Sequence, residues 1–175
     1  MKKTFRITLC AICSALSFVV ILLGYFPYFT YAAPAVAGLF VMIPVIETGL
    51  TYAFATYLTS AVLVTLFAEP ETKVLFLVLF GFYPIIKSIF EKIPNRILEW
   101  VLKLTTFTSS IVVSYLIFKY LTDIDVNDFG PLGKYGAGVF LVLCYIAFVL
   151  YDLAISQISS FYFARIRPKL DGLKK

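Results

Sequence analysis

Histidine is absent from this chain of 175 residues, and charged residues make up only 14% of it. The sequence contains neither a Gly-Lys-Ser/Thr phosphate loop nor a Gly-x-Ser-x-Gly nucleophile elbow. No nucleophile with a base, and no metal-binding cluster, can be assembled from the residue types present. We therefore expect that the protein is not an enzyme, that it uses no cofactor or metal, and that any pumping draws energy from a partner.

The scarcity of charge also excludes a soluble domain, because 61% of the residues are hydrophobic and too few polar ones remain to cover a surface. Long apolar segments separated by short polar turns are typical of membrane-spanning helices, and the length leaves room for about six spans and little else. The basic residues behind the net charge of +5 do not form one exposed face. We attribute this charge to cytoplasmic flanks and lipid headgroups rather than to nucleic-acid binding.

The positive charges alternate along the chain between crowded and sparse connections. Three crowded regions hold Lys2, Lys3 and Arg6, then Lys87, Lys92, Arg96 and Lys103, then Arg165, Arg167, Lys169, Lys174 and Lys175. The intervening connections hold Lys73, Lys119 and Lys134 among acidic residues. Positive charge beside membrane spans stays on the cytoplasmic side. The pattern predicts a multi-pass protein of the plasma membrane with both ends in the cytoplasm.

The apolar runs predict an all-α integral membrane fold with one domain over residues 1–175. The six expected helices cover about 5–23, 32–46, 50–67, 74–90, 97–121 and 135–164. The second is short for a span of about 20 residues. Pro84 should kink the fourth, because proline removes a backbone donor and crowds the preceding turn. Outer loops are expected at 68–73 and 122–134, and Glu99 and Lys103 are spaced for an i,i+4 pair.

The amino-terminal segment superficially resembles a signal peptide. Its apolar run, from Ile7 to Leu23, is longer than the usual core of about 7–15 residues, so we expect an uncleaved first helix. Cys10 and Cys13 in this helix form a C-x-x-C pattern. Zinc requires four nitrogen or sulfur ligands, and a redox pair requires an exposed helix terminus. Neither condition is met, so both cysteines are expected to be packing thiols.

Ala11 and Ala15 lie one helical turn apart near the start of the first helix. Small residues at this spacing allow two helix backbones to approach closely in lipid, where no hydrophobic effect drives association. The alternative interpretation is packing within the chain, because Ala33 and Ala37 have the same spacing. Ala11 and Ala15 differ from Ala33 and Ala37 because they lie near the expected cytoplasmic start of the first helix.

A first helix with Ala-x-x-x-Ala near its cytoplasmic start, in a basic six-span chain of this length, resembles the S components of energy-coupling-factor vitamin transporters. The resemblance covers the layout of the whole chain, but among individual residues only Ala11 and Ala15 carry it. It implies a bacterial importer in which these alanines dock the chain on a membrane T component driven by two cytoplasmic ATPases. The substrate would be a small vitamin-like nutrient captured from outside.

The resemblance places the ligand at the outer side of the membrane. Residues available there are Tyr28, Tyr31, Lys73, Lys119, Asp123 and Lys134. A tyrosine ring offers a stacking face and a hydroxyl for a flat heterocycle. Lys73 and Lys134 together would suit a carboxylate or phosphate. The alternatives are an interfacial aromatic belt for the tyrosines and solvated loop charge for the others.

Three ionisable groups, Glu47, Lys87 and Asp152, are expected at or inside the inner leaflet. An unpaired charge at this depth costs several kcal/mol, so such groups face the bundle interior and seek partners. Lys87 is the natural partner for Asp152 or Glu47. The cluster predicts a structural clamp between the fourth and sixth helices, a contact with a T component, or a proton relay.

Two alternatives to the importer role fit the same residues. One is a self-sufficient proton-coupled transporter of small solutes that uses the three inner charges, and the other is a ligand-free membrane scaffold. Six spans without a detected internal repeat are atypical of secondary transporters. Uptake driven by a pH gradient in vesicles that contain this protein alone identifies the first function. The absence of any ligand-induced thermal shift identifies the second.

Overall fold

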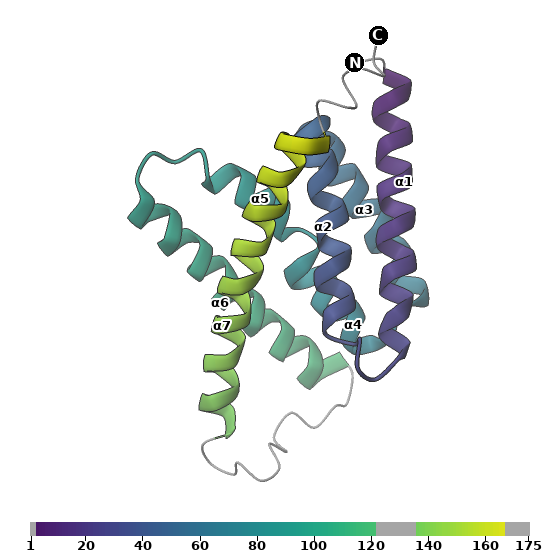
Figure 1. Cartoon of the computed structure of the whole chain (residues 1–175). Helices are drawn as coiled ribbons and strands as arrows, with labels where there is room; N and C mark the ends of the chain where they lie inside the picture. Colours follow the sequence, from purple (N-terminus) through teal and green to yellow (C-terminus); the bar gives the residue numbers. More distant parts are fainter. Residues whose placement is uncertain (1–2, 122–135, 167–175) are drawn as a thin grey trace. The chain divides into compact units, whose positions relative to one another are not determined.

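A computed structural model of the chain describes residues 3–121 and 136–166, and all regular structure within them is helical (Figure 1). Five helices are long and apolar enough to cross a membrane: Lys3–Tyr25, Leu50–Phe67, Pro70–Phe90, Arg96–Ile117 and Leu141–Arg165. Ala32–Glu47 has 16 residues and is shorter, as its sequence predicts. The helical character is confirmed for the described residues, and the apolar helices of spanning length indicate a multi-pass membrane protein. The count of six spans and the cytoplasmic position of both ends stay predictions.

The helix boundaries follow the apolar runs closely. In chain order they are α1 (Lys3–Leu22), a 3-10 turn (Leu23–Tyr25), α2 (Ala32–Glu47), α3 (Leu50–Phe67), α4 (Pro70–Leu75), a π-helical turn (Phe76–Phe80), α5 (Tyr83–Phe90), α6 (Arg96–Leu121), α7 (Gly136–Phe161) and a second π-helical turn (Tyr162–Ile166). The chain divides after Ser114 into two compact units. The expectation of one six-helix domain stays a prediction, and each unit is described by itself.

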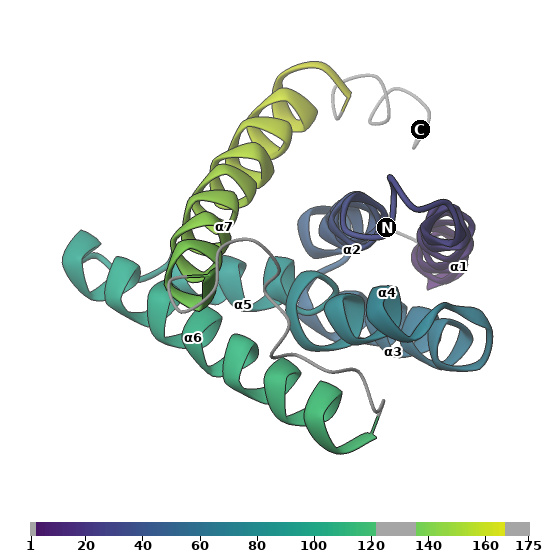
Figure 2. The ribbon, with the colours of Figure 1, turned by 90° about the horizontal axis from the view of Figure 1, so that it is seen from below.

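The first unit is built around three helices, α1, α2 and α3, which pack against one another. Figure 2 looks at them end on, with α1 beside α2 and α3 next to the pair. α2 also packs against α5 and the first π-helical turn. The core contains Ile21, Ala37, Val41, Ala53, Val64, Ala68, Phe76 and Ile85. Small residues from α2 and α3 are prominent in this core, which lets the helices approach closely.

α1 and α3 run parallel with a constant register of 42 residues. Cys10 Sγ donates to the Tyr52 carbonyl at 3.6 Å, and Ser14 Oγ donates to the Thr56 carbonyl at 3.2 Å. The second bond lies one helical turn beyond the first on both helices, because residues four positions apart share a helix face. Cys13, between these positions, is buried and free. Within the described ranges no group of metal-ligating side chains is found, and Cys10 contacts α3.

The predicted outer loop at 68–73 is wrong over most of its length. The turn after α3 contains only Ala68 and Glu69, and α4 begins at Pro70. Proline suits the first helical position because its fixed φ matches the helix and its missing N–H would have no partner there. Glu71 in the first turn adds a favourable charge beside the helix dipole. The polar residues of this segment therefore start a helix instead of a loop. The other expected outer loop, 122–134, lies outside the described residues.

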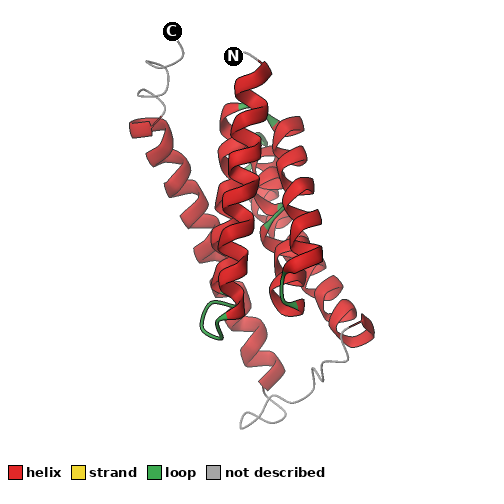
Figure 3. Ribbon diagram, turned by 90° about the vertical axis from the view of Figure 1, so that its right-hand side faces the viewer, coloured by secondary structure: helices red, strands yellow, loops and turns green. Residues whose placement is uncertain are grey.

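The fourth predicted helix, 74–90, is irregular ahead of Pro84. The first π-helical turn is followed by a two-residue turn at Gly81 and Phe82, whose backbone angles stay in the right-handed helical region, and α5 begins at Tyr83 with Pro84 in its first turn. The residues Pro70–Phe90 together are long and apolar enough to form one span. The proline therefore begins a new helix, where its missing donor costs nothing. Gly81 allows a close approach at the turn, because a Cβ there would lie 2.7 Å from the Phe76 carbonyl oxygen. Short connections of this kind are green in Figure 3.

Candidate functional site

The two faces of α1 differ in what they contact. Ser14 and Ser17 are buried, and Ser17 Oγ donates to the Ala37 carbonyl of α2 at 3.1 Å. Ala11 and Ala15 lie on the neighbouring face of the helix and are exposed. Because 3.6 residues make a turn, positions 11 and 15 share a face distinct from that of 14 and 17. The alanines predicted to dock a partner are thus not used in packing within the first unit.

Bulky exposed side chains flank these alanines. Ile7, Ile12, Leu16 and Val19 are between 44% and 61% exposed. Two methyl-sized residues between branched ones leave a shallow strip on an otherwise apolar helix. Such a strip suits either lipid chains or the backbone of a second helix.

The connection from α1 to α2 carries five exposed aromatic side chains: Tyr25, Phe26, Tyr28, Phe29 and Tyr31. Tyr28 is 93% exposed and Tyr31 is 66% exposed. Aromatic rings in this position fit either a ligand gate or an interfacial belt. The high exposure of Tyr28 means that the described residues cover little of its ring.

The same connection is fixed to the start of α4 by hydrogen bonds. Thr72 Oγ1 donates to the Thr30 carbonyl at 3.3 Å, and Thr30 Oγ1 donates to the Gly24 carbonyl at 3.1 Å. A Cβ at Gly24 would lie 2.6 Å from Thr72 Oγ1, so only glycine allows this approach. The aromatic connection is therefore held as a unit against α4.

Tyr31 is the predicted ligand residue with the clearest chemistry. Its hydroxyl donates to Glu71 Oε2 at 3.3 Å. Partial burial raises the pKa of Tyr31 above its usual value, and the Glu71 carboxylate raises it further by charge and by hydrogen bonding. The phenol therefore stays neutral and acts as a donor at physiological pH. Sequence reasoning missed Glu71 because it assigned this segment to a loop.

The other outer candidates are brought together only in part. Lys73 is half-buried in α4, two residues after Glu71. Lys119 belongs to the last turn of α6. Asp123 and Lys134 lie outside the described residues. Joint action of Lys73 and Lys134 on an acidic ligand stays a prediction.

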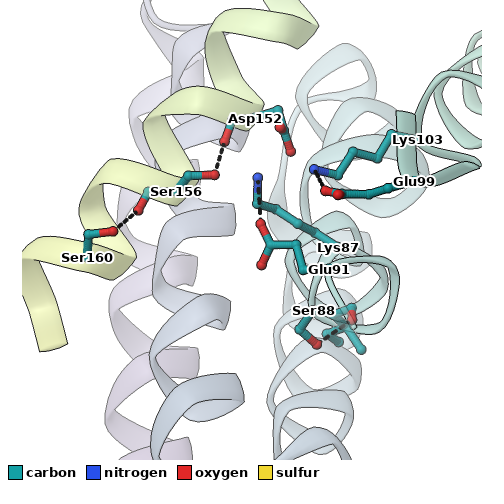
Figure 4. A network of polar contacts seen from close by, with 9 residues as sticks. Lys87, Ser88, Glu91, Glu99, Lys103, Asp152, Ser156 and Ser160 are labelled. Carbon is teal, nitrogen blue, oxygen red and sulfur yellow. Dashed lines mark hydrogen bonds and ion pairs between the residues drawn. The ribbon is translucent and has the colours of Figure 1, made fainter. Parts of the chain in front are cut away.

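Lys87 and Lys103 are both buried in the first unit, with exposed fractions of 2% and 3%. Lys87 Nζ lies 3.3 Å from Glu91 Oε1, and Lys103 Nζ lies 2.7 Å from Glu99 Oε1 (Figure 4). The Glu99–Lys103 pair is the i,i+4 contact that the sequence predicts. Glu91 was missed as a partner of Lys87, although the same spacing was present in the sequence.

The other two predicted inner charges occupy separate places. Glu47 is the last residue of α2. Asp152, on α7 in the second unit, is 2% exposed, and its backbone carbonyl accepts a hydrogen bond from Ser156 Oγ at 3.1 Å (Figure 4). The sequence predicts that Asp152 faces the interior of the helix bundle, and this stays a prediction. Because Lys87 and Asp152 belong to different units, their clustering stays a prediction.

Comparison with protein-family models, with curated proteins and with solved structures found no match to the chain.

Proposed function

We propose that the chain is the membrane-embedded substrate-binding subunit of an energy-coupling-factor type importer, with a vitamin-like nutrient as its substrate. The observation that carries this proposal is the division of α1 into two faces. Ser14 and Ser17 hold the helix to α3 and α2, whereas Ala11 and Ala15 remain exposed. A first helix that is anchored on one side and smooth on the other suits docking on a second membrane subunit.

The aromatic connection supports a role in ligand capture. Its rings are exposed, while its backbone is held to α4 through Thr30 and Thr72. Rigid support with exposed rings favours stacking on a flat ligand at low entropic cost. The substrate-binding residues proposed from the described chain are Tyr28, Tyr31 and Lys73, with Glu71 as the partner that orients Tyr31.

The test is co-purification of the tagged full chain with a T component and two ATPases from its own membranes. Ala11→Trp and Ala15→Trp place a large ring on the smooth strip, so we expect each to abolish co-purification while ligand affinity is unchanged. Val62→Trp is the matched control, because Val62 is 60% exposed on α3. If the alanine variants retain the ATPases as well as the control does, the docking role of α1 is wrong.

A second candidate function is proton-coupled transport by the chain alone. The irregular span 70–90, with its π-helical turn ahead of Pro84, favours it, since helices that depart from regular geometry form the ion and substrate sites of many secondary transporters. Lys87, buried one turn after Pro84, would lie on the proton path, with Glu47 and Asp152 as the other predicted members. Purified protein in liposomes should then take up solute when a pH gradient is imposed, and Lys87→Met should stop the uptake. The first proposal predicts no such uptake.

A further inference from the structure

The first π-helical turn, Phe76–Phe80, is held by a side chain from another helix. At its end the Gly81 N–H donates to the Phe76 carbonyl at 2.8 Å, five residues back, whereas in a regular α-helix it would donate to the Leu77 carbonyl. The Leu77 carbonyl accepts instead from Tyr57 Oη on α3, also at 2.8 Å. The Tyr57 hydroxyl therefore binds the acceptor that the Gly81 N–H would use in the α-helical form of this turn.

The Tyr57 ring also packs against the turn. A Cβ at Gly81 would lie 2.9 Å from this ring, and the centres of the Tyr57 and Phe76 rings are 6.2 Å apart. Tyr57 thus lies against both residues of the hydrogen bond that makes the turn π-helical. The ring and the hydroxyl hold the same turn, but only the hydroxyl takes part in its backbone hydrogen bonding.

The backbone at the end of the turn is close to both forms. Gly81 has φ −73° and ψ −41°, and Phe82 has φ −93° and ψ −18°. Both residues are in the right-handed helical region, so conversion to the α-helical form requires small dihedral changes and the exchange of a hydrogen bond. Pro84 disfavours the α-helical form, because its ring crowds the carbonyl four residues earlier. We therefore expect the α-helical form to be the minor one.

We propose that this turn is a conformational switch within the span 70–90, and that the Tyr57 hydroxyl holds it in the π-helical form. A π-helical turn contains one residue more than an α-helical turn. Conversion therefore rotates α4 relative to α5 by about 100° and separates them by about 1.5 Å, the rotation and rise of one residue. The switch does not depend on the proposed transport function, because its evidence is the hydrogen bonding of one span.

The switch links the aromatic connection to the buried lysine of α5. α4 is fixed to the aromatic connection by the hydrogen bonds from Thr72 to Thr30 and from Tyr31 to Glu71, both of 3.3 Å. α5 carries Lys87, which is 2% exposed. A change in the turn between α4 and α5 therefore alters the position of Lys87 relative to the aromatic connection.

The experiment measures the distance between α4 and α5 by double electron–electron resonance. Spin labels are attached through Lys73→Cys and Ile89→Cys in the full chain, with its three native cysteines replaced, in lipid nanodiscs. A rotation of about 100° moves a label by several ångströms, so the two forms give separate distances. We expect one major and one minor distance. Tyr57→Phe should raise the ratio of minor to major about threefold, the effect of one average hydrogen bond between membrane helices.

Two further variants separate a switch from general loosening. Tyr25→Phe also removes a hydroxyl bond to a backbone carbonyl, that of Phe67 at 2.5 Å, and should leave both distances and their ratio unchanged. Deletion of Val78 takes one residue out of the π-helical turn, so this segment becomes α-helical while α4 and α5 keep their original rotation. Adding Tyr57→Phe to the deletion should therefore leave the major distance alone.

Three results would overturn the proposal. An unchanged ratio in Tyr57→Phe would show that the hydroxyl does not control the turn. Equal changes in Tyr57→Phe and Tyr25→Phe would indicate a general loss of stability. A second distance that persists when Tyr57→Phe is combined with the deletion would show that α4 and α5 move without a change in the turn. If the deletion variant fails to fold, the comparison of Tyr57→Phe with Tyr25→Phe decides.

Discussion

Ser14 on α1 donates a hydrogen bond of 3.2 Å to the Thr56 carbonyl on α3, and both residues are buried. Continued by one turn, the same register would place Phe18 opposite Ser60. The phenylalanine side chain has no polar atom, and Ser60 Oγ is buried without a hydrogen-bond partner in the described chain. One hydroxyl therefore links the helices and the other does not.

This contrast predicts opposite effects of two identical substitutions. Ser14→Ala should lower the free energy of unfolding by about 0.6 kcal/mol, the average for a hydrogen bond between membrane helices. Ser60→Ala should leave it unchanged or raise it, because it removes an unsatisfied buried group. Unfolding of both variants in mixed micelles measures the difference. Equal losses of unfolding free energy would show that the Ser14 hydroxyl stabilises the protein no more than the Ser60 hydroxyl does.

The irregular turn within the span 70–90 makes Gly81 a sensitive position. A Cβ there would lie 2.7 Å from the Phe76 carbonyl oxygen and 2.9 Å from the Tyr57 ring, and the backbone oxygen cannot move aside cheaply. Gly81→Ala should therefore destabilise the protein by about 1–3 kcal/mol, as overpacking does.

Gly138→Ala is the control for Gly81→Ala. Gly138 lies in α7, and a Cβ added there would meet no atom of the described chain within 4 Å. Alanine in a helix reduces the entropy of the unfolded chain, so Gly138→Ala should be neutral or stabilising by about 0.4–1 kcal/mol. Thermal unfolding of the two variants side by side decides the point. A Gly81→Ala protein as stable as the control would contradict the close approach at the turn.

Tyr31 gives the protein a testable dependence on high pH. Because partial burial and Glu71 raise the pKa of Tyr31, the folded state favours the neutral phenol. The resulting stability is present below the pKa of the unfolded chain and is lost as pH rises through the raised value. The phenolate absorbance of the natural chain minus that of Tyr31→Phe reports on Tyr31 alone. It should rise at a higher pH than the absorbance of an ordinary tyrosine. Glu71→Gln should lower this pKa without restoring it fully, since burial, the larger cause, remains.

The two lysine–glutamate pairs differ in how much each carboxylate matters. The Glu99 side chain is 18% exposed and lies 2.7 Å from Lys103, whereas the Glu91 side chain is 46% exposed and lies 3.3 Å from Lys87. Glu99→Gln should therefore cost more stability than Glu91→Gln, by about 1–2 kcal/mol, because losing a partner of a buried charge is expensive. Adding Lys103→Met to Glu99→Gln should recover most of the loss. A double variant no better than the single one would contradict this.

Sequence reasoning predicted the helices better than the positions of their ends. Continuous apolar runs determine where helices form, and α3 was predicted at its observed bounds, Leu50–Phe67. The turn at Gly81 and Phe82 was not predicted, because the sequence indicates only a kink caused by Pro84. The closeness of Gly81 to Phe76 and Tyr57, which allows the turn, arises from packing that the sequence does not display.

The candidate site was predictable to the extent that it depends on spacing within one helix. The separation of Ala11 and Ala15 placed both on one face, and their exposure agrees with a docking surface. Glu71 as the acceptor for Tyr31 was not predictable, because the two residues are 40 positions apart and meet only through the fold. Side-chain contacts across helices depend on helix rotation, which hydrophobic patterning leaves open.

The central claim is that this chain binds a small nutrient and works through a separate ATPase module. Native mass spectrometry of the tagged protein, purified in mild detergent from its own membranes, tests both parts at once. The account predicts an assembly with one further membrane subunit and two ATPases, and a bound compound of vitamin size that stays with the chain when the assembly dissociates. A chain that carries no small molecule and associates with no ATPase would contradict it.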